Sequence, residues 1–410
     1  MSLNIKKSKI QNRQSKITIT GSKSESNRLL LLQALFPKLQ IENVSNSDDS
    51  QLMAKALASH SNLVDIHHAG TAMRFLTAFF STQEGREIEL TGSKRMKERP
   101  IKILVDALNQ LGANIGYKEN EGYPPLLIKG QRITKHKVNL KANVSSQYIS
   151  ALLLIATKLE NGLELTLEGK ITSVPYIEMT LSLLNQIGVE THFSGNVITV
   201  RSRNEGLNED TRLVVESDWS SASYFYGIVA LAEVGTSIEL SSYKKNSLQG
   251  DSALTELYKD FGVETTFGEN TITLTKSRIV DSETVIDFDL ANSPDIAQTI
   301  SVTAFALELE CKLKGLHTLK IKETDRLEAL KAEIEKLGGV VNITEDALHL
   351  SASKTINENI SIATYNDHRM AMAFASLALR VPIVIEDAAV VSKSYPTFWE
   401  DLKTIGFQFD

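Results

Sequence analysis

Six segments of this chain begin in the same way, and their starts recur at nearly even spacing. Each opens with small or charged polar residues and continues into about ten mostly apolar ones. The first two starts are 46 residues apart, and the later gaps are 75, 75, 74 and 73 residues. The segments start at Ser24, Gly70, Ser145, Ser220, Pro294 and Asp367. This regularity predicts six copies of one supersecondary unit.

Each apolar helix is followed by a strand-like stretch and then by a second, amphipathic helix. The predicted strands are 39–44, 86–92, 162–169, 236–242, 311–316 and 381–387. The predicted second helices are 49–59, 100–111, 175–187, 251–261, 325–337 and 397–404. A glycine suited to a left-handed C-cap ends five of them: Gly112, Gly188, Gly262, Gly338 and Gly406. Chance periodicity in an ordinary α/β chain is the alternative, and it does not explain why all these features recur in register.

At 410 residues and 42% apolar content, the chain is long and apolar enough to form two domains with ordinary cores. Six units divide into three plus three at 214–218. The strand-like pieces in the first 19 residues could cross to the second half. Two similar domains with their helix N-termini facing each other would enclose a cleft.

Composition excludes several classes of protein. No apolar run is long enough to span a membrane, and the N-terminal residues have no secretory apolar region. A single cysteine, Cys311, allows neither an intrachain disulfide framework nor a cysteine-based metal site. The net charge of −6 argues against a general nucleic-acid surface. We therefore expect a cytoplasmic protein that binds neither nucleic acid nor membrane.

The polar openings of the repeats predict helix N-termini, whose free N–H groups and positive dipole favour anions. Several openings also carry a cation: Lys23, Arg28, Arg74 and Arg369. Because the chain as a whole is acidic, these cations are a local feature. The sequence therefore predicts a site for a small, highly charged anion.

Each charged motif also has a plain structural interpretation. The segments 21–28 and 69–74 could be capped helices with solvated cations, and the charge run 95–100 could be a solvated loop. The hydroxyls and amide of 145–147 could donate to a phosphate or only cap a helix. His67 and His68 lack the spacing and acidic partners of a metal site.

The segment 322–326 (KETDR) is harder to explain by structure alone. Thr324 or Asp325 can cap the helix that follows, which leaves Lys322, Glu323 and Arg326 unexplained. A carboxylate between cations is costly if buried without pairing, and it suits general acid–base chemistry.

Together, and in order along the whole chain, these segments resemble the 5-enolpyruvylshikimate-3-phosphate synthase family of enolpyruvyl transferases. The matching motifs are GSKSESNR (21–28), AGTAMR (69–74), LTGSKRMKERP (90–100), SSQY (145–148), PYIE (175–178), SSASYF (220–225), PD (294–295), KETDRL (322–327), NDHRMAM (366–372) and KSYP (393–396).

The resemblance implies an α/β fold of two similar domains, each made of three βαβαββ repeats arranged as an inside-out α/β barrel, with a cleft between them. The implied domains are 20–216 and 1–19 plus 217–410, with hinges near 20 and 216. The implied protein is a monomer without metal or organic cofactor.

The implied reaction joins the 5-hydroxyl of shikimate 3-phosphate to phosphoenolpyruvate and releases phosphate. Asp295 would act as base, Glu323 would exchange the proton at C3, and Lys23 would assist. The residues implied to bind shikimate 3-phosphate are Lys23, Ser24, Arg28, Ser145, Ser146, Ser173, Tyr176, Asp295, Thr318 and Lys322. Those implied to bind phosphoenolpyruvate are Lys23, Gly70, Arg95, Gln147, Arg326, Arg369 and Lys393. Glyphosate, an anionic mimic of phosphoenolpyruvate, is an expected inhibitor.

The chain departs from the family pattern at His68, Val174 and Thr318, and at Phe75, where proline is usual. Two other functions stay open. The sister enzyme that acts on UDP-N-acetylglucosamine usually carries a cysteine on a mobile loop, whereas Cys311 is predicted to lie on a strand of the other domain. A non-catalytic anion-binding clamshell would need the cations but neither Asp295 nor Glu323.

Overall fold

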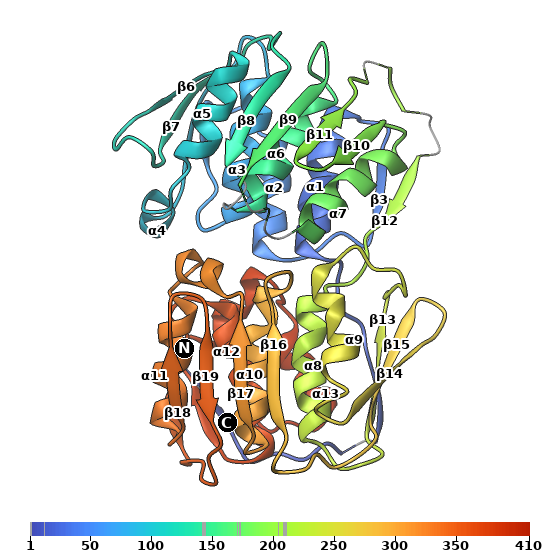
Figure 1. Cartoon of the computed structure of the whole chain (residues 1–410), viewed down its shortest axis with the longest axis vertical. Coiled ribbons are helices and arrows are strands. Elements are labelled where there is room, and N and C mark those ends of the chain that lie inside the picture. Colours follow the sequence, from blue (N-terminus) through green and yellow to red (C-terminus); the bar gives the residue numbers. More distant parts are fainter. Residues whose placement is uncertain are drawn as a thin grey trace. The chain divides into compact units, whose positions relative to one another are not determined.

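The computed structural model describes residues 2–11, 13–141, 145–169, 171, 174–203, 205–207 and 211–410. The chain divides into two compact units, one formed by Gly21–Val215 and the other by the residues up to Thr20 together with Glu216–Asp410. We call them the first unit and the second unit (Figure 1).

The first unit contains the helices α1 (Lys23–Leu35), α2 (Asp48–Leu57), α3 (Gly70–Ser81), α4 (Lys94–Lys97), α5 (Lys102–Leu111), α6 (Ser146–Ala156) and α7 (Val174–Gln186). Its strands are β3 (Gln40–Glu42), β4 (Leu63–Asp65), β5 (Glu87–Thr91), β6 (Asn114–Tyr117), β7 (Leu126–Lys129), β8 (Lys137–Lys141), β9 (Leu163–Glu168), β10 (Thr191–Ser194), β11 (Val197–Val200) and β12 (Arg212–Val214).

The second unit contains the helices α8 (Trp219–Leu231), α9 (Leu254–Leu257), α10 (Ala297–Ala306), α11 (Arg326–Lys336), α12 (His368–Ala375) and α13 (Phe398–Thr404). Its strands are β1 (Leu3–Ile5), β2 (Gln14–Ile17), β13 (Ser237–Ser241), β14 (Val263–Phe267), β15 (Thr271–Lys276), β16 (Val285–Asp289), β17 (Glu310–Lys314), β18 (Val340–Ile343), β19 (Leu348–Ser351), β20 (Ile360–Ile362) and β21 (Ile383–Ile385).

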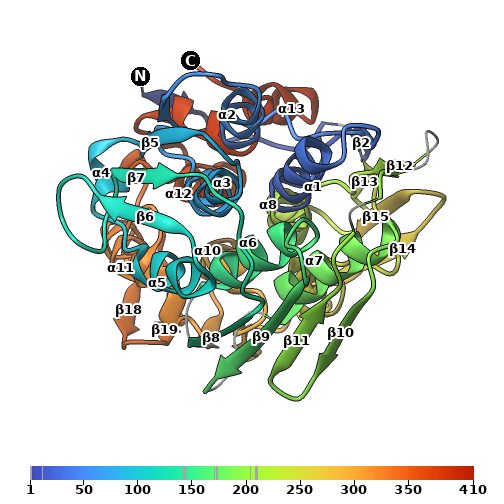
Figure 2. The same ribbon diagram turned by 90° about the horizontal axis from the view of Figure 1, so that it is seen from above.

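The repeat is visible in the strand order of the sheets. Within the described residues, four sheets share one order: β4-β5-β7-β6, β8-β9-β11-β10, β2-β13-β15-β14 and β16-β17-β19-β18. In each, the first two strands are parallel and the next pairs are antiparallel. Figure 2 shows β9, β11 and β10 side by side. The predicted α/β fold built from repeats is therefore confirmed.

Two outer strands are exchanged along the chain. The strand that immediately precedes α1 is β2, yet it pairs in parallel with β13 of the second unit, from Gln14 opposite Ser237 to Ile17 opposite Leu240. The strand that precedes α8 is β12, yet it pairs in parallel with β3 of the first unit. Strand β1 likewise pairs with β21 of the second unit. Strand β2 therefore forms the edge of the β13 sheet, and β12 forms the second strand beside β3, although neither pairs with the elements next to it in the sequence.

The two helices of a repeat differ in burial. All residues of α3, α8, α10 and α12 are buried, and these helices run through the interior of their units while the sheets lie toward the outside (Figure 1). A helix that is apolar on all sides needs such a surrounding. The second helices, such as α5 and α7, bury one face only.

Four predicted C-cap glycines are confirmed: Gly112, Gly188, Gly338 and Gly406 lie within two residues of a helix end and have φ values from 76° to 113°. Gly262 also has a positive φ, 73°, but it lies in a turn beyond the end of α9. The helix predicted over 251–261 is wrong in its extent. The structure has a 3₁₀ turn at Gly250–Ala253 and only one α-helical turn, α9. Leu254, Tyr258 and Phe261 are buried as the periodicity indicated, but the chain tightens after Tyr258, where the Phe261 N–H bonds to the Tyr258 carbonyl.

Candidate functional site

The second unit gathers three carboxylates around one buried arginine at the start of α11. Arg326 is 2% exposed. Its Nη1 donates to Asp295 Oδ1 at 2.7 Å, its Nη2 to Glu323 Oε2 at 2.9 Å and its Nε to Asp367 Oδ2 at 2.7 Å. We call these residues, together with Lys322 and Arg369, the Arg326 cluster. The cluster unites two of the residues predicted to act on protons.

Asp295 lies among three cations. Besides Arg326, Lys322 Nζ is 3.3 Å from its Oδ1 and Arg369 Nη2 is 3.4 Å from its Oδ2. Burial would raise the pKa of Asp295, but the charges of Arg369, Lys322 and Arg326 outweigh it and hold that pKa well below its usual value. Asp295 is therefore ionised at neutral pH and ready to accept hydrogen bonds.

The start of α12 orients Arg369 and brings Lys393 close to it. Asp367 caps this helix by accepting from the Arg369 N–H at 2.9 Å. Before it, Tyr365 and Asn366 have left-handed φ values of 52° and 59°. The Asn366 carbonyl accepts from Lys393 Nζ at 2.6 Å. The left-handed turn thus presents a carbonyl that holds the lysine.

Thr318 lies in the 3₁₀ turn His317–Ile321, just before Lys322. Its hydroxyl is buried and has no hydrogen-bond partner among the described residues. A buried hydroxyl normally has a partner. Its position fits the predicted role of contacting a substrate, which stays a prediction.

In the first unit, the predicted anion-binding lysine is already paired. Lys23 Nζ, in the first turn of α1, is 3.4 Å from Asp49 Oδ2 at the start of α2. His68 Nε2 is 3.8 Å from the other oxygen of the same carboxylate. Asp49 therefore faces both Lys23 and His68. His68 is one of the departures from the family pattern, and it lies close to the carboxylate that pairs with Lys23.

Arg28 lies in the second turn of α1, and its side chain is buried. Its guanidinium donates to Thr180 Oγ1 at 2.8 Å, Ser150 Oγ at 2.9 Å and the Ser24 carbonyl at 2.7 Å. It also donates to the Tyr176 carbonyl at 3.3 Å, and it stacks 5.5 Å from the ring centre of Phe75. Burial lowers the pKa of Arg28 to about 10. Arg28 thus ties α1, α6 and α7 together, and the departure at Phe75 supplies its aromatic surface.

The turn at Gly70 faces Arg99 rather than Arg95. A Cβ placed on Gly70 would lie 2.5 Å from Arg99 Nη1. Arg95 is half exposed and pairs with Glu98 at 3.2 Å on the short helix α4. The resemblance implied Arg95 for this place, and the structure puts the other arginine of the same charge run against the N-terminus of α3.

The backbone next to Arg99 is held by two side chains of the first unit. The Pro100 carbonyl accepts from Arg74 Nη2 at 3.3 Å and from the Tyr148 hydroxyl at 2.6 Å. Arg74 also donates to the Gly70 carbonyl at 3.0 Å. No acidic residue among those described pairs with Arg99, so its charge is available to an anion at this helix end.

The start of α6 lies beside the start of α3. Gln147 Nε2 donates to Thr71 Oγ1 at 3.2 Å. Ser145 caps α6 by accepting from the Gln147 N–H at 3.4 Å, and Ser146 is buried. Ser173 lies outside the described residues, and Tyr176 follows in the first turn of α7.

Comparison with known proteins identifies the family. The profile of EPSP synthase (3-phosphoshikimate 1-carboxyvinyltransferase) matches residues 57–402. The chain belongs to the EPSP synthase family. A 3-phosphoshikimate 1-carboxyvinyltransferase of Bacteroides fragilis is 44% identical over 401 residues, covering 95% of each chain. One of Histophilus somni is 37% identical over 421 residues, covering 95% of this chain and 96% of the relative.

Solved structures support the family's fold. EPSP synthase from Acinetobacter baumannii has a TM-score of 0.80 at 21% identity, covering 100% of this chain and 99% of that one. The enolpyruvyl transferase NikO from Streptomyces tendae has a TM-score of 0.76 at 14% identity, covering 100% and 98%. At such identities the likeness concerns the fold.

In this member of the EPSP synthase family, three residues that sequence reasoning did not single out contact or face predicted site residues. Asp49 and Asp367 are the counter-ions of Lys23 and Arg326, and Arg99 faces Gly70. The sequence identified Asp367 as the first residue of a repeat and as part of the motif NDHRMAM, without a role of its own. Its double role as helix cap and ion partner depends on α11 and α12 meeting in space.

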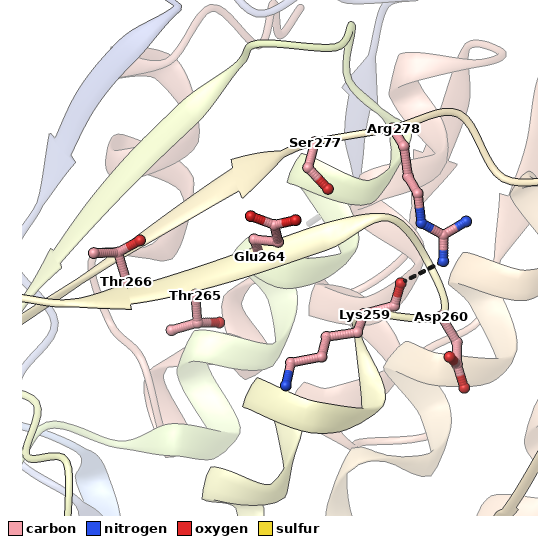
Figure 3. A pocket seen from close by; sticks show the side chains of 7 residues that line it. All are labelled: Lys259, Asp260, Glu264, Thr265, Thr266, Ser277 and Arg278. Carbon is pink, nitrogen blue, oxygen red and sulfur yellow. Dashed lines mark hydrogen bonds between the residues drawn. The ribbon is translucent and has the colours of Figure 1, made fainter.

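A separate polar pocket of about 380 Å³ lies in the second unit, between α9, β14 and β15. Lys259, Asp260, Glu264, Thr265, Thr266, Ser277 and Arg278 line it. Figure 3 shows Arg278 donating to the Lys259 carbonyl, at 2.9 Å. None of the predicted site residues lines this pocket, and we assign it no part in the reaction.

The part of the chain that the structure describes has neither a metal site built from acidic, His or Cys side chains nor a membrane-spanning helix. No group of three or more His, Cys, Asp or Glu side chains there could hold a metal ion. In the same part of the chain, no helix is both long and apolar enough to cross a membrane.

Proposed function

We propose that this protein transfers the enolpyruvyl group of phosphoenolpyruvate to the 5-hydroxyl of shikimate 3-phosphate and releases phosphate. The hydroxyl oxygen bonds to C2 while C3 gains a proton, and the resulting intermediate loses phosphate and a C3 proton. This is the reaction of the 3-phosphoshikimate 1-carboxyvinyltransferases to which the chain is similar. The observation that carries the proposal is the Arg326 cluster, where three carboxylates, among them Asp295 and Glu323, share one arginine with further cations beside them.

Asp295 is the proposed base for the 5-hydroxyl. Without substrate, three cations act on Asp295 only, and its low pKa makes it a weak base. When Lys322 and Arg369 also engage an anionic substrate, their attraction is shared and the pKa of Asp295 rises toward a useful range. Substrate binding therefore activates the base.

Glu323 is the proposed donor and acceptor of the C3 proton. One oxygen is oriented by Arg326 Nη2 at 2.9 Å, and the side chain is 24% exposed. The arginine fixes the carboxyl group's direction, and the exposure lets it exchange protons.

The anion-binding roles follow the resemblance, with one change. We propose Arg99 in place of Arg95 for phosphoenolpyruvate, because its guanidinium lies at Gly70 and has no acidic partner among the described residues. The other proposed contacts to phosphoenolpyruvate are Lys23, Gly70, Gln147, Arg326, Arg369 and Lys393. Those proposed for shikimate 3-phosphate are Lys23, Ser24, Arg28, Ser145, Ser146, Ser173, Tyr176, Asp295, Thr318 and Lys322.

The test is release of phosphate with each substrate alone and with both together, without added metal and with a chelator. We expect phosphate only when both substrates are present. UDP-N-acetylglucosamine serves as the alternative acceptor, and turnover with it would favour the sister enzyme. Binding of both substrates without turnover would favour the non-catalytic clamshell. The sole cysteine, Cys311, is buried in β17, where burial raises the pKa of its thiol, so it does not resemble a reactive loop cysteine.

We further propose that the enzyme works as a monomer in the cytoplasm, on two small-molecule substrates and without metal or cofactor. Sedimentation equilibrium that gave the mass of two chains at working concentration would contradict the monomer.

A further inference from the structure

The SSASYF motif (220–225) has no role in the proposed reaction, yet its first serine is part of a buried polar chain. Helix α8 does not need this hydroxyl as a cap. Asp218 already caps the helix by accepting from the Ser220 N–H at 2.8 Å and the Ser221 N–H at 3.4 Å. The Ser220 side chain is therefore free for another task.

That hydroxyl connects an acid to an arginine of the Arg326 cluster. Ser220 Oγ donates to Asp251 Oδ2 and accepts from Arg369 Nη2 at 3.2 Å. The same Arg369 nitrogen is 3.4 Å from Asp295 Oδ2. Asp251 is 3% exposed and lies in the 3₁₀ turn after Gln249. Ser220 of α8 and Asp295 of the 3₁₀ turn Pro294–Ile296 thus meet at the guanidinium of Arg369, and Asp251 reaches it through Ser220.

We propose that Asp251 and Ser220 are positioning residues for Arg369, holding its guanidinium toward Asp295 for the anionic substrate. The inference rests on the proposed function, in which Arg369 binds phosphoenolpyruvate. Neither residue touches the reacting atoms in this scheme.

The direction of the hydrogen bonds supports this arrangement. An ionised carboxylate only accepts, so Ser220 must donate its single proton to Asp251. The lone pairs of Ser220 Oγ are then left for Arg369, and the guanidinium gains an acceptor in a fixed place. Without Asp251 the hydroxyl could rotate and direct its proton elsewhere.

The hydrogen bonds from Asp251 through Ser220 to Arg369 are also compatible with a neutral Asp251. Burial, followed by the charges of Asp295 and Asp218, raises the pKa of Asp251 to about 7, against the opposing effects of Arg369 and Ser220. Its Oδ1 is buried without a partner among the described residues and can carry the proton. Oδ2 then still accepts from Ser220.

The test is a double-mutant cycle of Ser220→Ala and Asp251→Ala, with KM measured separately for each substrate. We expect each change to raise KM for phosphoenolpyruvate about tenfold, the scale of one hydrogen bond to a charged group. KM for shikimate 3-phosphate should change by less than about threefold, and the double variant should match the single ones because both act through one chain. Asp251→Asn keeps an oxygen acceptor and should restore KM to within about threefold of wild type.

Ser223→Ala is the matched control, because the hydroxyl of this buried serine of the same helix bonds to Thr299 and to the Ser220 carbonyl, and neither to Arg369 nor to the Ser220 hydroxyl. Multiplying effects in the double variant, equal rises of both KM values, or an Asp251→Asn variant as weak as Asp251→Ala would each overturn the inference. Ser220→Ala carries the test if Asp251→Ala does not fold. Failure of the wild type to release phosphate overturns the proposed function instead. In that case, a crystal structure of Ser220→Ala tests separately whether Ser220 positions Arg369. A guanidinium in the same place as in the wild type would refute this role.

Discussion

Replacing Gly70 by alanine should weaken the handling of phosphoenolpyruvate while sparing the fold. The added Cβ would lie 2.5 Å from Arg99 Nη1 and 3.1 Å from both Cζ and Nη2, whereas ordinary contact begins at 3.4 Å. The guanidinium must therefore retreat by about 1 Å, the difference between 3.4 and 2.5 Å. It is the far end of a flexible side chain, so it moves in preference to the backbone.

The size of the effect follows from that displacement. A misplacement of about 1 Å at a group that positions a substrate can cost on the order of 100-fold. Charge-assisted hydrogen bonds are short and directional, so a retreating guanidinium loses much of its grip on an anion. We expect KM for phosphoenolpyruvate to rise by roughly ten- to a hundredfold, with KM for shikimate 3-phosphate and the melting temperature nearly unchanged.

The assay is steady-state phosphate release with each substrate varied in turn, for Gly70→Ala, Arg99→Ala and Arg95→Ala. Arg99→Ala should resemble Gly70→Ala. Arg95→Ala should resemble the wild type, because its pair with Glu98 is half exposed and such pairs contribute little. Glyphosate should compete with phosphoenolpyruvate in the wild type and inhibit Gly70→Ala much less.

Two results would refute this reasoning. If Gly70→Ala and Arg99→Ala keep a normal KM for phosphoenolpyruvate, the turn does not shape its binding. If Arg95→Ala shows the large effect instead, the original assignment from the sequence was right and the contact at Gly70 is incidental.

Three further outcomes are expected. Asp295→Asn and Glu323→Gln should each lower kcat by at least about 100-fold, the scale of positioned acid–base catalysis, and near-normal turnover would remove the role of that residue. Arg326→Met should lower the free energy of unfolding in urea by about 3–5 kcal/mol, because buried carboxylates lose their partner, and the loss should shrink as acid protonates them. Asp251→Asn should be more stable than the wild type above pH 7. The folded pKa of about 7 exceeds the unfolded value of about 3.9, so wild-type stability falls as pH rises between them, by up to about 4 kcal/mol; equal melting temperatures at pH 4 and a growing gap up to pH 8 would confirm the sign.

Local patterns in the sequence predicted most of the fold. Helix α8 follows from a polar opening and an apolar run, strand β13 follows from local alternation, and the left-handed φ at Gly112 follows from the residue type. The motifs also identified Asp295, Glu323 and Arg326, which the structure unites. These features were predictable because each depends on neighbours along the chain or on a motif that is specific as a set.

Features that depend on distant parts of the chain were decided only by the tertiary structure. The exchange of β2 and β12 follows from pairings with strands far along the chain, such as Gln14 opposite Ser237. The composition of the run 95–100 gives the charge of its two arginines, but it does not say which of them faces Gly70. In the folded chain, Arg74 and Tyr148 hold the Pro100 carbonyl by hydrogen bonds, and the adjacent Arg99 lies at Gly70.

The partners of the buried aspartates were also decided only by the tertiary structure. Asp251 and Asp367 are ordinary helix-start residues in the sequence, and each gains its partner only in the folded chain. Asp251 meets Ser220 from the other helix of its own repeat, and Asp367 meets Arg326 of the preceding repeat. A buried charge is stable only when another group compensates it, and the compensating group is chosen by proximity in space. The sequence therefore determined which kinds of side chain stand at the helix starts, while the tertiary structure determined which of them face one another.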